Sequence, residues 1–87
     1  MNYQKLIDKC RKYYRKKDLK NAYQYWCKIH DLLLNKLDSF DKYDEKNVNK
    51  CYQEFYNYMR QFTDDEVYDI TDYGKELYYI ENGYLEI

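Results

Sequence analysis

The chain of 87 residues contains no proline and only two glycines, Gly74 and Gly83. Both residue types interrupt helices, because proline lacks a backbone N–H donor and glycine loses much conformational freedom on folding. The residues before Gly74 hold neither type, which favours long helices. The length predicts a single domain over residues 1–87, with one core and little room for a buried cleft.

Long apolar segments are also missing. No apolar run reaches the roughly 18 residues that a membrane-spanning helix needs. The first eight residues lack the apolar stretch of a secretory signal, so we expect a cytoplasmic location and no membrane partner. The three cysteines, Cys10, Cys27 and Cys51, are odd in number and form no C-x-x-C pair. They are interpreted as reduced thiols.

Residue types that carry catalysis are scarce. The one histidine, His30, has no serine or threonine near it in the sequence, because the hydroxyls are Ser39, Thr63 and Thr71. No phosphate-binding loop, dinucleotide fingerprint or nucleophile elbow is present. We therefore expect no enzyme activity and no cofactor.

Two metal sites are considered, and calcium is not expected because no D-x-D-x-D-G loop is present. Cys27 and His30, with Cys10 and Cys51, would make a Cys₃His set of the kind that holds structural zinc. The spacing of Cys27 and His30 across one helical turn differs from that of zinc knuckles. Cysteines also fit a core as small hydrophobic residues, so we expect no metal.

Tyrosine is abundant, with fourteen copies. Tyrosine offers a large contact area and a polar tip at little cost in side-chain entropy, which makes it common in binding surfaces. A genome rich in A and T is an alternative explanation. The net charge of −1 hides an asymmetry: residues 1–36 hold ten basic and three acidic residues, whereas residues 37–87 hold five and thirteen. Such polarity between halves indicates a binding partner.

Apolar residues at helical spacing predict a first helix over about 2–16 and a second over about 19–37, with Asp18 as its N-cap. The short link between them predicts an antiparallel hairpin. We expect Trp26 in the core, together with eight other residues: Leu6, Cys10, Tyr13, Ile29, Leu33, Phe55, Phe62 and Ile70.

Part of this pattern resembles a known repeat. Tyr13, the segment 17–22 that ends in Ala22, then Trp26 and Ile29 are similar to one tetratricopeptide-type helical hairpin, over residues 6–36. Lys9 and Cys10 replace the usual small pair, Ile29 stands where alanine is typical, and no second repeat follows. The resemblance implies hairpin geometry.

A third helix is predicted over about 45–62, after a cap at Asp44. Thr63 and Glu66 form a capping box, in which each side chain binds the other residue's free backbone N–H. A fourth helix therefore begins at Asp64. The segment 77–87 has two interpretations: a β-hairpin around Asn82-Gly83, or a helix that continues to about Glu81. We favour the hairpin, because Asn-Gly between β-prone residues is a strong turn signal and glycine weakens a helix. The predicted fold is mainly α, a compact bundle of three to four helices with a short C-terminal β-hairpin.

The acidic segment 63–87 is the first candidate binding surface. Carboxylates along a helix can imitate a row of phosphates, and neighbouring tyrosines can fill the pockets that bases would occupy. We predict that this face binds a protein partner with a basic surface, through Asp64, Asp65, Asp69, Asp72, Glu76, Tyr68, Tyr73 and Tyr79. A solubilising surface that suits the helix dipole is the alternative.

The basic first helix is the second candidate. Its cations would bind nucleic acid phosphates by counterion release, dock an acidic protein, or only solvate the helix. The residues concerned are Lys12, Arg15, Lys16 and Lys20.

In size and composition the chain resembles the small proteins that phages and mobile elements use against host machinery, including anti-CRISPR proteins. This resemblance implies a non-catalytic inhibitor or adaptor that blocks a host nucleic-acid-binding protein. A nucleic-acid-binding regulator that uses the basic helix is the alternative function. A homo-oligomer joined by opposite charges is the third hypothesis.

Overall fold

The computed structural model describes residues 2–41 and 43–83, which form four helices. The helices are α1 (Tyr3–Arg15), α2 (Leu19–Asp38), α3 (Glu45–Met59) and α4 (Asp64–Glu81). Each lies where the sequence predicted a helix, so the mainly α class is confirmed. None of the four combines the length and apolar content that crossing a membrane requires.

Local capping fixes where the helices begin. Asp18 accepts a hydrogen bond from the Asn21 backbone N–H (3.2 Å), and Asp44 caps α3 in the same way. Thr63 and Glu66 form the predicted capping box at α4. The link from α1 to α2 turns through Lys17, whose φ of 60° lies in the left-handed region. These contacts span only a few residues, which is why the sequence alone could locate them.

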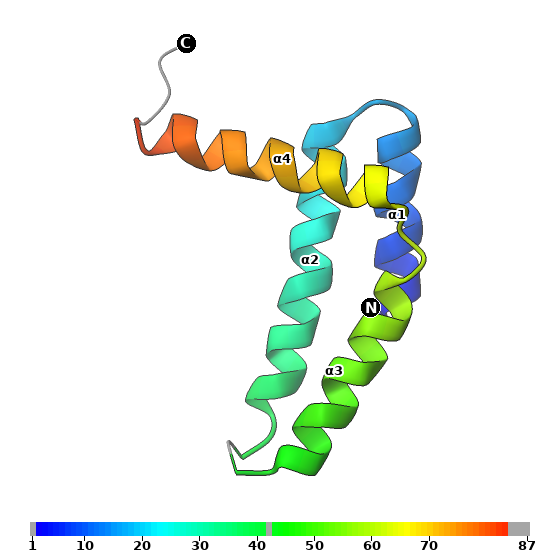
Figure 1. The fold of residues 1–87 in the computed structure, drawn as a ribbon, viewed down its shortest axis with the longest axis vertical. Coiled ribbons are helices and arrows are strands. Elements are labelled where there is room, and N and C mark those ends of the chain that lie inside the picture. The colour runs from blue at the N-terminus through cyan, green and yellow to red at the C-terminus, as the bar shows by residue number, and fades with distance from the viewer. Residues whose placement is uncertain (1, 42, 84–87) are drawn as a thin grey trace.

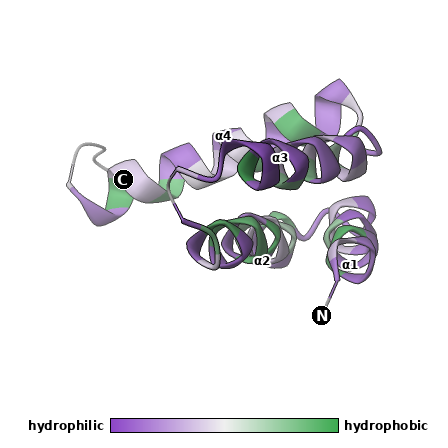
Figure 2. Ribbon diagram, turned by 90° about the horizontal axis from the view of Figure 1, so that it is seen from below, coloured by the Kyte–Doolittle hydropathy of each residue, from purple (hydrophilic) through white to green (hydrophobic). Residues whose placement is uncertain are grey.

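The helices form two layers. Figure 2 shows α1 and α2 side by side in one layer, with α3 and α4 above them. Helix α3 runs back antiparallel to α2, and α4 then crosses over α2 and α1 at the other end (Figure 1). The outer face of α4 is therefore turned away from the layer that carries the basic first helix.

The core lies between these layers. Its buried apolar side chains are Tyr3, Leu6, Ile7, Cys10, Ala22, Ile29, Leu33, Cys51, Phe55, Phe62 and Ile70. Two predicted core residues, Tyr13 and Trp26, are only half-buried and pack against the edge of this cluster. The sequence pattern did not single out Tyr3, which is 1% exposed.

The preference for a C-terminal β-hairpin was wrong. Residues 77–81, its first strand, belong to α4, and its second strand at 84–87 lies outside the described residues. The Asn-Gly pair ends the helix instead: Asn82 caps it and Gly83 takes a φ of 73°. A glycine in the left-handed region after a helix is a common C-terminal signal. The same dipeptide therefore has a different structural role from the one predicted.

Gly74 lies inside α4 because the helix packs closely against α2 at this point. A Cβ atom on Gly74 would lie 2.2 Å from Cε2 of Tyr23, so the ring in its present position requires glycine here. This packing offsets the helix propensity cost of about 1 kcal/mol. Val67 is 36% exposed, whereas Ile70 is fully buried, as the sequence predicted.

Candidate functional site

The outer side of α4 carries most of the predicted acidic residues. Asp65, Tyr68, Asp72, Glu76 and Tyr79 recur every three or four residues, which places them along one side of the helix. The first four are exposed and Tyr79 is half-buried, while Asp64 is exposed at the start of the helix. Tyr68 is 69% exposed. We call these six residues the acidic face.

The opposite side of α4 is anchored to α1 by a buried ion pair. Glu66 is 5% exposed, and the Arg11 guanidinium donates to its carboxylate at 2.9 and 3.2 Å. The Thr63 backbone N–H donates to the same carboxylate at 3.1 Å. Burial alone would raise the pKa of Glu66, but the hydrogen bonds from Arg11 and Thr63 outweigh it and keep this pKa below its ordinary value. One acid of the segment is therefore neutralised inside the molecule.

Asp69 also serves the contact between α1 and α4. The Tyr14 hydroxyl donates to its carboxylate at 2.6 Å, and this hydrogen bond raises the pKa of Tyr14 to about 12. Asp69 was predicted to contact a partner, but the structure turns it toward α1. Tyr73 likewise points to α2, where its ring meets the Tyr23 ring edge-on at 5.9 Å. These two residues do not join the acidic face.

The predicted basic residues lie on the other layer. Lys12, Arg15, Lys16 and Lys20 are all exposed. None of them forms an ion pair with residues 2–41 or 43–83. The basic and acidic candidates are thus two separate surfaces on opposite layers (Figure 2).

A pair of tyrosines extends the basic surface onto α2. Tyr13 and Tyr25 stack with ring centroids 5.6 Å apart and an interplanar angle of 10°. The ammonium groups of Lys9 and Lys28 lie 5.6 and 4.7 Å from the centre of the Tyr25 ring. Sequence reasoning missed Tyr25 and Lys28, although their spacing of three residues places them on one side of the predicted second helix.

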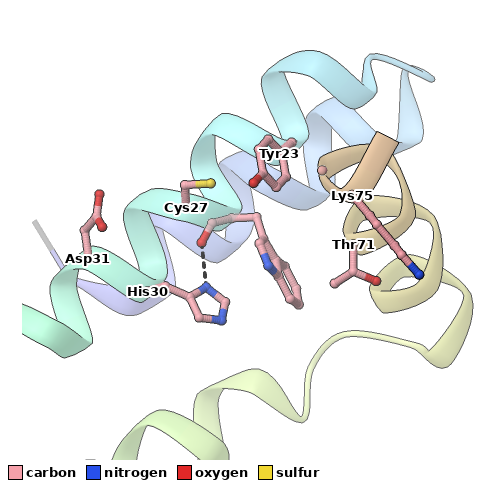
Figure 3. A pocket seen from close by; sticks show the side chains of 8 residues that line it. Tyr23, Cys27, His30, Asp31, Thr71 and Lys75 are labelled. Atoms are coloured by element: carbon pink, nitrogen blue, oxygen red, sulfur yellow. Dashed lines mark hydrogen bonds between the residues drawn. The ribbon is translucent and has the colours of Figure 1, made fainter. Parts of the chain in front are cut away.

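A groove of about 410 Å³ opens between α2 and α4. Figure 3 shows Tyr23, Cys27 and His30 on α2 near Thr71 and Lys75 on α4, with Asp31 farther along α2. Hydrogen bonding to the Cys27 thiol and burial raise the pKa of Tyr23. The groove has no counterpart in the sequence predictions, because it depends on the crossing of two helices that are distant in the chain.

The cysteines and the histidine do not come together as a metal site. No three His, Cys, Asp or Glu side chains within the described ranges are arranged to hold an ion. Cys10 is fully buried and donates to the Ala22 carbonyl at 3.2 Å, and burial raises the pKa of its thiol to about 12. This thiol is a core residue and is poorly suited to act as a nucleophile, which requires the thiolate.

Comparison with known proteins does not assign a family. No family model, curated protein or solved structure matches the chain.

Proposed function

We propose that the protein is a non-catalytic protein-binding module that uses the acidic face of α4 to occupy a basic site on a partner protein. The observation that carries the proposal is the row of exposed carboxylates and phenols on one side of a single helix. Asp65, Asp72 and Glu76 form no ion pair among the described residues. Their side chains are exposed to solvent.

The support beneath the acidic face favours binding. The capping box and the Arg11–Glu66 pair hold the first turn of α4, and the Tyr14–Asp69 hydrogen bond holds the next turn. Because the backbone is already ordered, binding does not have to fold it. Tyr68 adds an exposed aromatic side chain with few rotatable bonds, a residue type enriched at binding hot spots.

The spacing of the carboxylates suits a site that binds nucleic acid. At about 1.5 Å of rise per residue, Asp72 lies about 10 Å along the helix from Asp65 and about 6 Å from Glu76. A row of negative charges at such separations can occupy a basic groove that accepts the phosphate backbone of nucleic acid. A module with this spacing would compete with nucleic acid, which makes it an inhibitor of its partner.

The test is affinity capture with surface variants. The double variant Asp72→Lys/Glu76→Lys reverses two exposed charges and leaves the contacts between α1 and α4 intact. We expect the wild-type chain to retain a protein partner after nuclease treatment and the variant to lose it, with unchanged circular dichroism. The matched control, Lys12→Glu/Lys16→Glu, reverses two charges on the other layer and should retain the partner. Retention by the α4 variant would refute the proposal.

The basic surface supports a second candidate function, the binding of nucleic acid. The specific observation in its favour is the stacked Tyr13–Tyr25 pair with Lys9 and Lys28 beside it. Phosphate binding by lysines weakens steeply with salt, because each phosphate contact releases condensed counterions. A salt-dependent gel shift that Lys12→Glu/Lys16→Glu abolishes would support this function, and no shift at low salt would exclude it.

A further inference from the structure

The groove between α2 and α4 adjoins the acidic face. Its residues Thr71 and Lys75 also line a smaller depression of about 210 Å³, which continues to Tyr68 and Asp72. A partner that lies on the acidic face can therefore place one side chain in the groove. The Trp26 ring lines the groove and is held edge-on to Phe62 at 5.1 Å between centroids.

His30 presents a hydrogen-bond acceptor. Its Nδ1 lies 2.8 Å from the Trp26 carbonyl oxygen, and a carbonyl only accepts, so Nδ1 carries the proton. In the neutral ring, Nε2 is then left with a free lone pair. Figure 3 shows this edge of the imidazole turned away from the Trp26 carbonyl. Nε2 has no hydrogen-bond partner in the part of the chain described.

The remaining polar groups around the groove add acceptors. The Thr71 hydroxyl donates to the Val67 and Tyr68 carbonyls at 2.7 and 3.2 Å, which leaves its lone pairs for a ligand. Asp31 is exposed at the rim and pairs with no described cation. The ammonium of Lys75 lies 6.0 Å from the centroid of the Tyr79 ring, and Figure 3 shows it extending away from Tyr23.

We propose that this groove receives an arginine side chain from the partner protein. A guanidinium is planar, carries five N–H donors and no acceptor, and stacks well on an aromatic ring. The Trp26 ring would supply the stacking surface and His30 Nε2 would accept a hydrogen bond, while the Asp31 carboxylate at the rim would add negative charge. A lysine has a compact, strongly hydrated charge and would use the ring less well. The inference rests on the proposed function in one respect, the basic character of the partner.

The experiment uses Trp26 itself as the reporter, because the chain contains one tryptophan. N-acetyl-arginine amide is titrated into the full chain at constant ionic strength while Trp26 fluorescence is recorded. We expect a saturable change with half-saturation in the order of millimolar, since a single small ligand gains few contacts. The lysine analogue should bind more weakly, and the neutral citrulline analogue should give no saturable change.

Two variants, Asp31→Asn and His30→Phe, link the response to the groove, and Asp38→Asn is their control. Asp31→Asn removes the rim carboxylate without a change in shape, and Asp38→Asn removes an exposed carboxylate from the same helix outside the groove. His30→Phe keeps an aromatic ring but removes the acceptor. We expect Asp31→Asn and His30→Phe to weaken the arginine response and Asp38→Asn to leave it unchanged.

Failure of this inference differs from failure of the proposed function. An equal response to citrulline, or an Asp31→Asn variant that titrates like wild type, would overturn the arginine groove, whatever the capture experiment shows. Because Asp31 is exposed, its variant folds even if His30→Phe does not. Saturable arginine-specific binding combined with full partner retention by Asp72→Lys/Glu76→Lys would support the groove while refuting the acidic face.

Discussion

Replacement of Gly74 by alanine tests the packing that orients α4. In an isolated helix, Gly→Ala stabilises by about 1 kcal/mol, because alanine restricts the unfolded chain and has the higher helix propensity. Here the added Cβ would lie 2.2 Å from Cε2, 2.6 Å from Cζ and 3.0 Å from Cδ2 of Tyr23. The Tyr23 ring must therefore move or the two helices must separate.

The cost of that movement exceeds the gain in helix propensity. Overpacking a close contact costs about 1–3 kcal/mol. Displacement of the Tyr23 ring also weakens its edge contact with Tyr73, and such contacts contribute about 0.5–1.5 kcal/mol. After subtraction of the propensity gain, Gly74→Ala should lower the free energy of unfolding by about 0.5–3.5 kcal/mol. For a chain of this size, each kcal/mol of lost stability lowers Tm by roughly 4–8 °C.

Urea and thermal unfolding followed by circular dichroism measure this effect. The control Asp72→Ala changes an exposed position on the same helix and should leave stability unchanged or slightly higher. In a Tyr23→Ala background the clash is absent, so Gly74→Ala should become stabilising by about 1 kcal/mol. Stabilisation by Gly74→Ala in the wild-type background would refute the packing of α2 against α4 at this residue.

Two further predictions concern the contacts that α1 makes with the rest of the molecule. Glu66→Gln removes the charge that Arg11 binds and should lower the free energy of unfolding by about 2 kcal/mol in urea at neutral pH. The pKa of Glu66 in the folded protein lies below its ordinary value of 4.5. The stability that the Arg11–Glu66 ion pair contributes is therefore fully present above pH 4.5, and it is lost as the pH falls through the lowered pKa. The difference between wild type and variant should shrink in acid, and a pH-independent difference would contradict the ion pair. Tyr3→Phe removes a buried hydroxyl that has no hydrogen-bond partner among the described residues, so it should raise the free energy of unfolding by about 1 kcal/mol; a loss of stability would show that the hydroxyl is bonded.

The parts of the fold that depend on neighbouring residues were predictable from the sequence. Asp18 and the Thr63–Glu66 capping box act within one helical turn, so the starts of α2 and α4 could be located. The apolar stripe of α2 correctly placed Ile29 and Leu33 in the core.

Features that depend on distant residues were not predictable. Arg11 and Glu66 are 55 residues apart, as are Tyr14 and Asp69, and no local pattern indicates which charges pair. Gly74 counted against a helix that continues to Glu81, because its reason for lying inside a helix, the Tyr23 ring, belongs to another element.

The same distinction applies to the candidate site. The charge pattern of the sequence grouped Asp65, Tyr68, Asp72 and Glu76 with Asp69 in one candidate binding surface. It could not show that Asp69 bonds to α1, because only the crossing of the helices decides this.

Calorimetry with the captured partner tests the proposed binding surface most directly. Dissociation constants are compared for the wild type, the α4 variant Asp72→Lys/Glu76→Lys and the α1 variant Lys12→Glu/Lys16→Glu. Since like charges opposed across an interface cost several kcal/mol, we predict that the α4 variant binds about a hundredfold more weakly, about 2.7 kcal/mol, and that the α1 variant binds like wild type. Equal affinity of the α4 variant and wild type would contradict the assignment of binding to the acidic face.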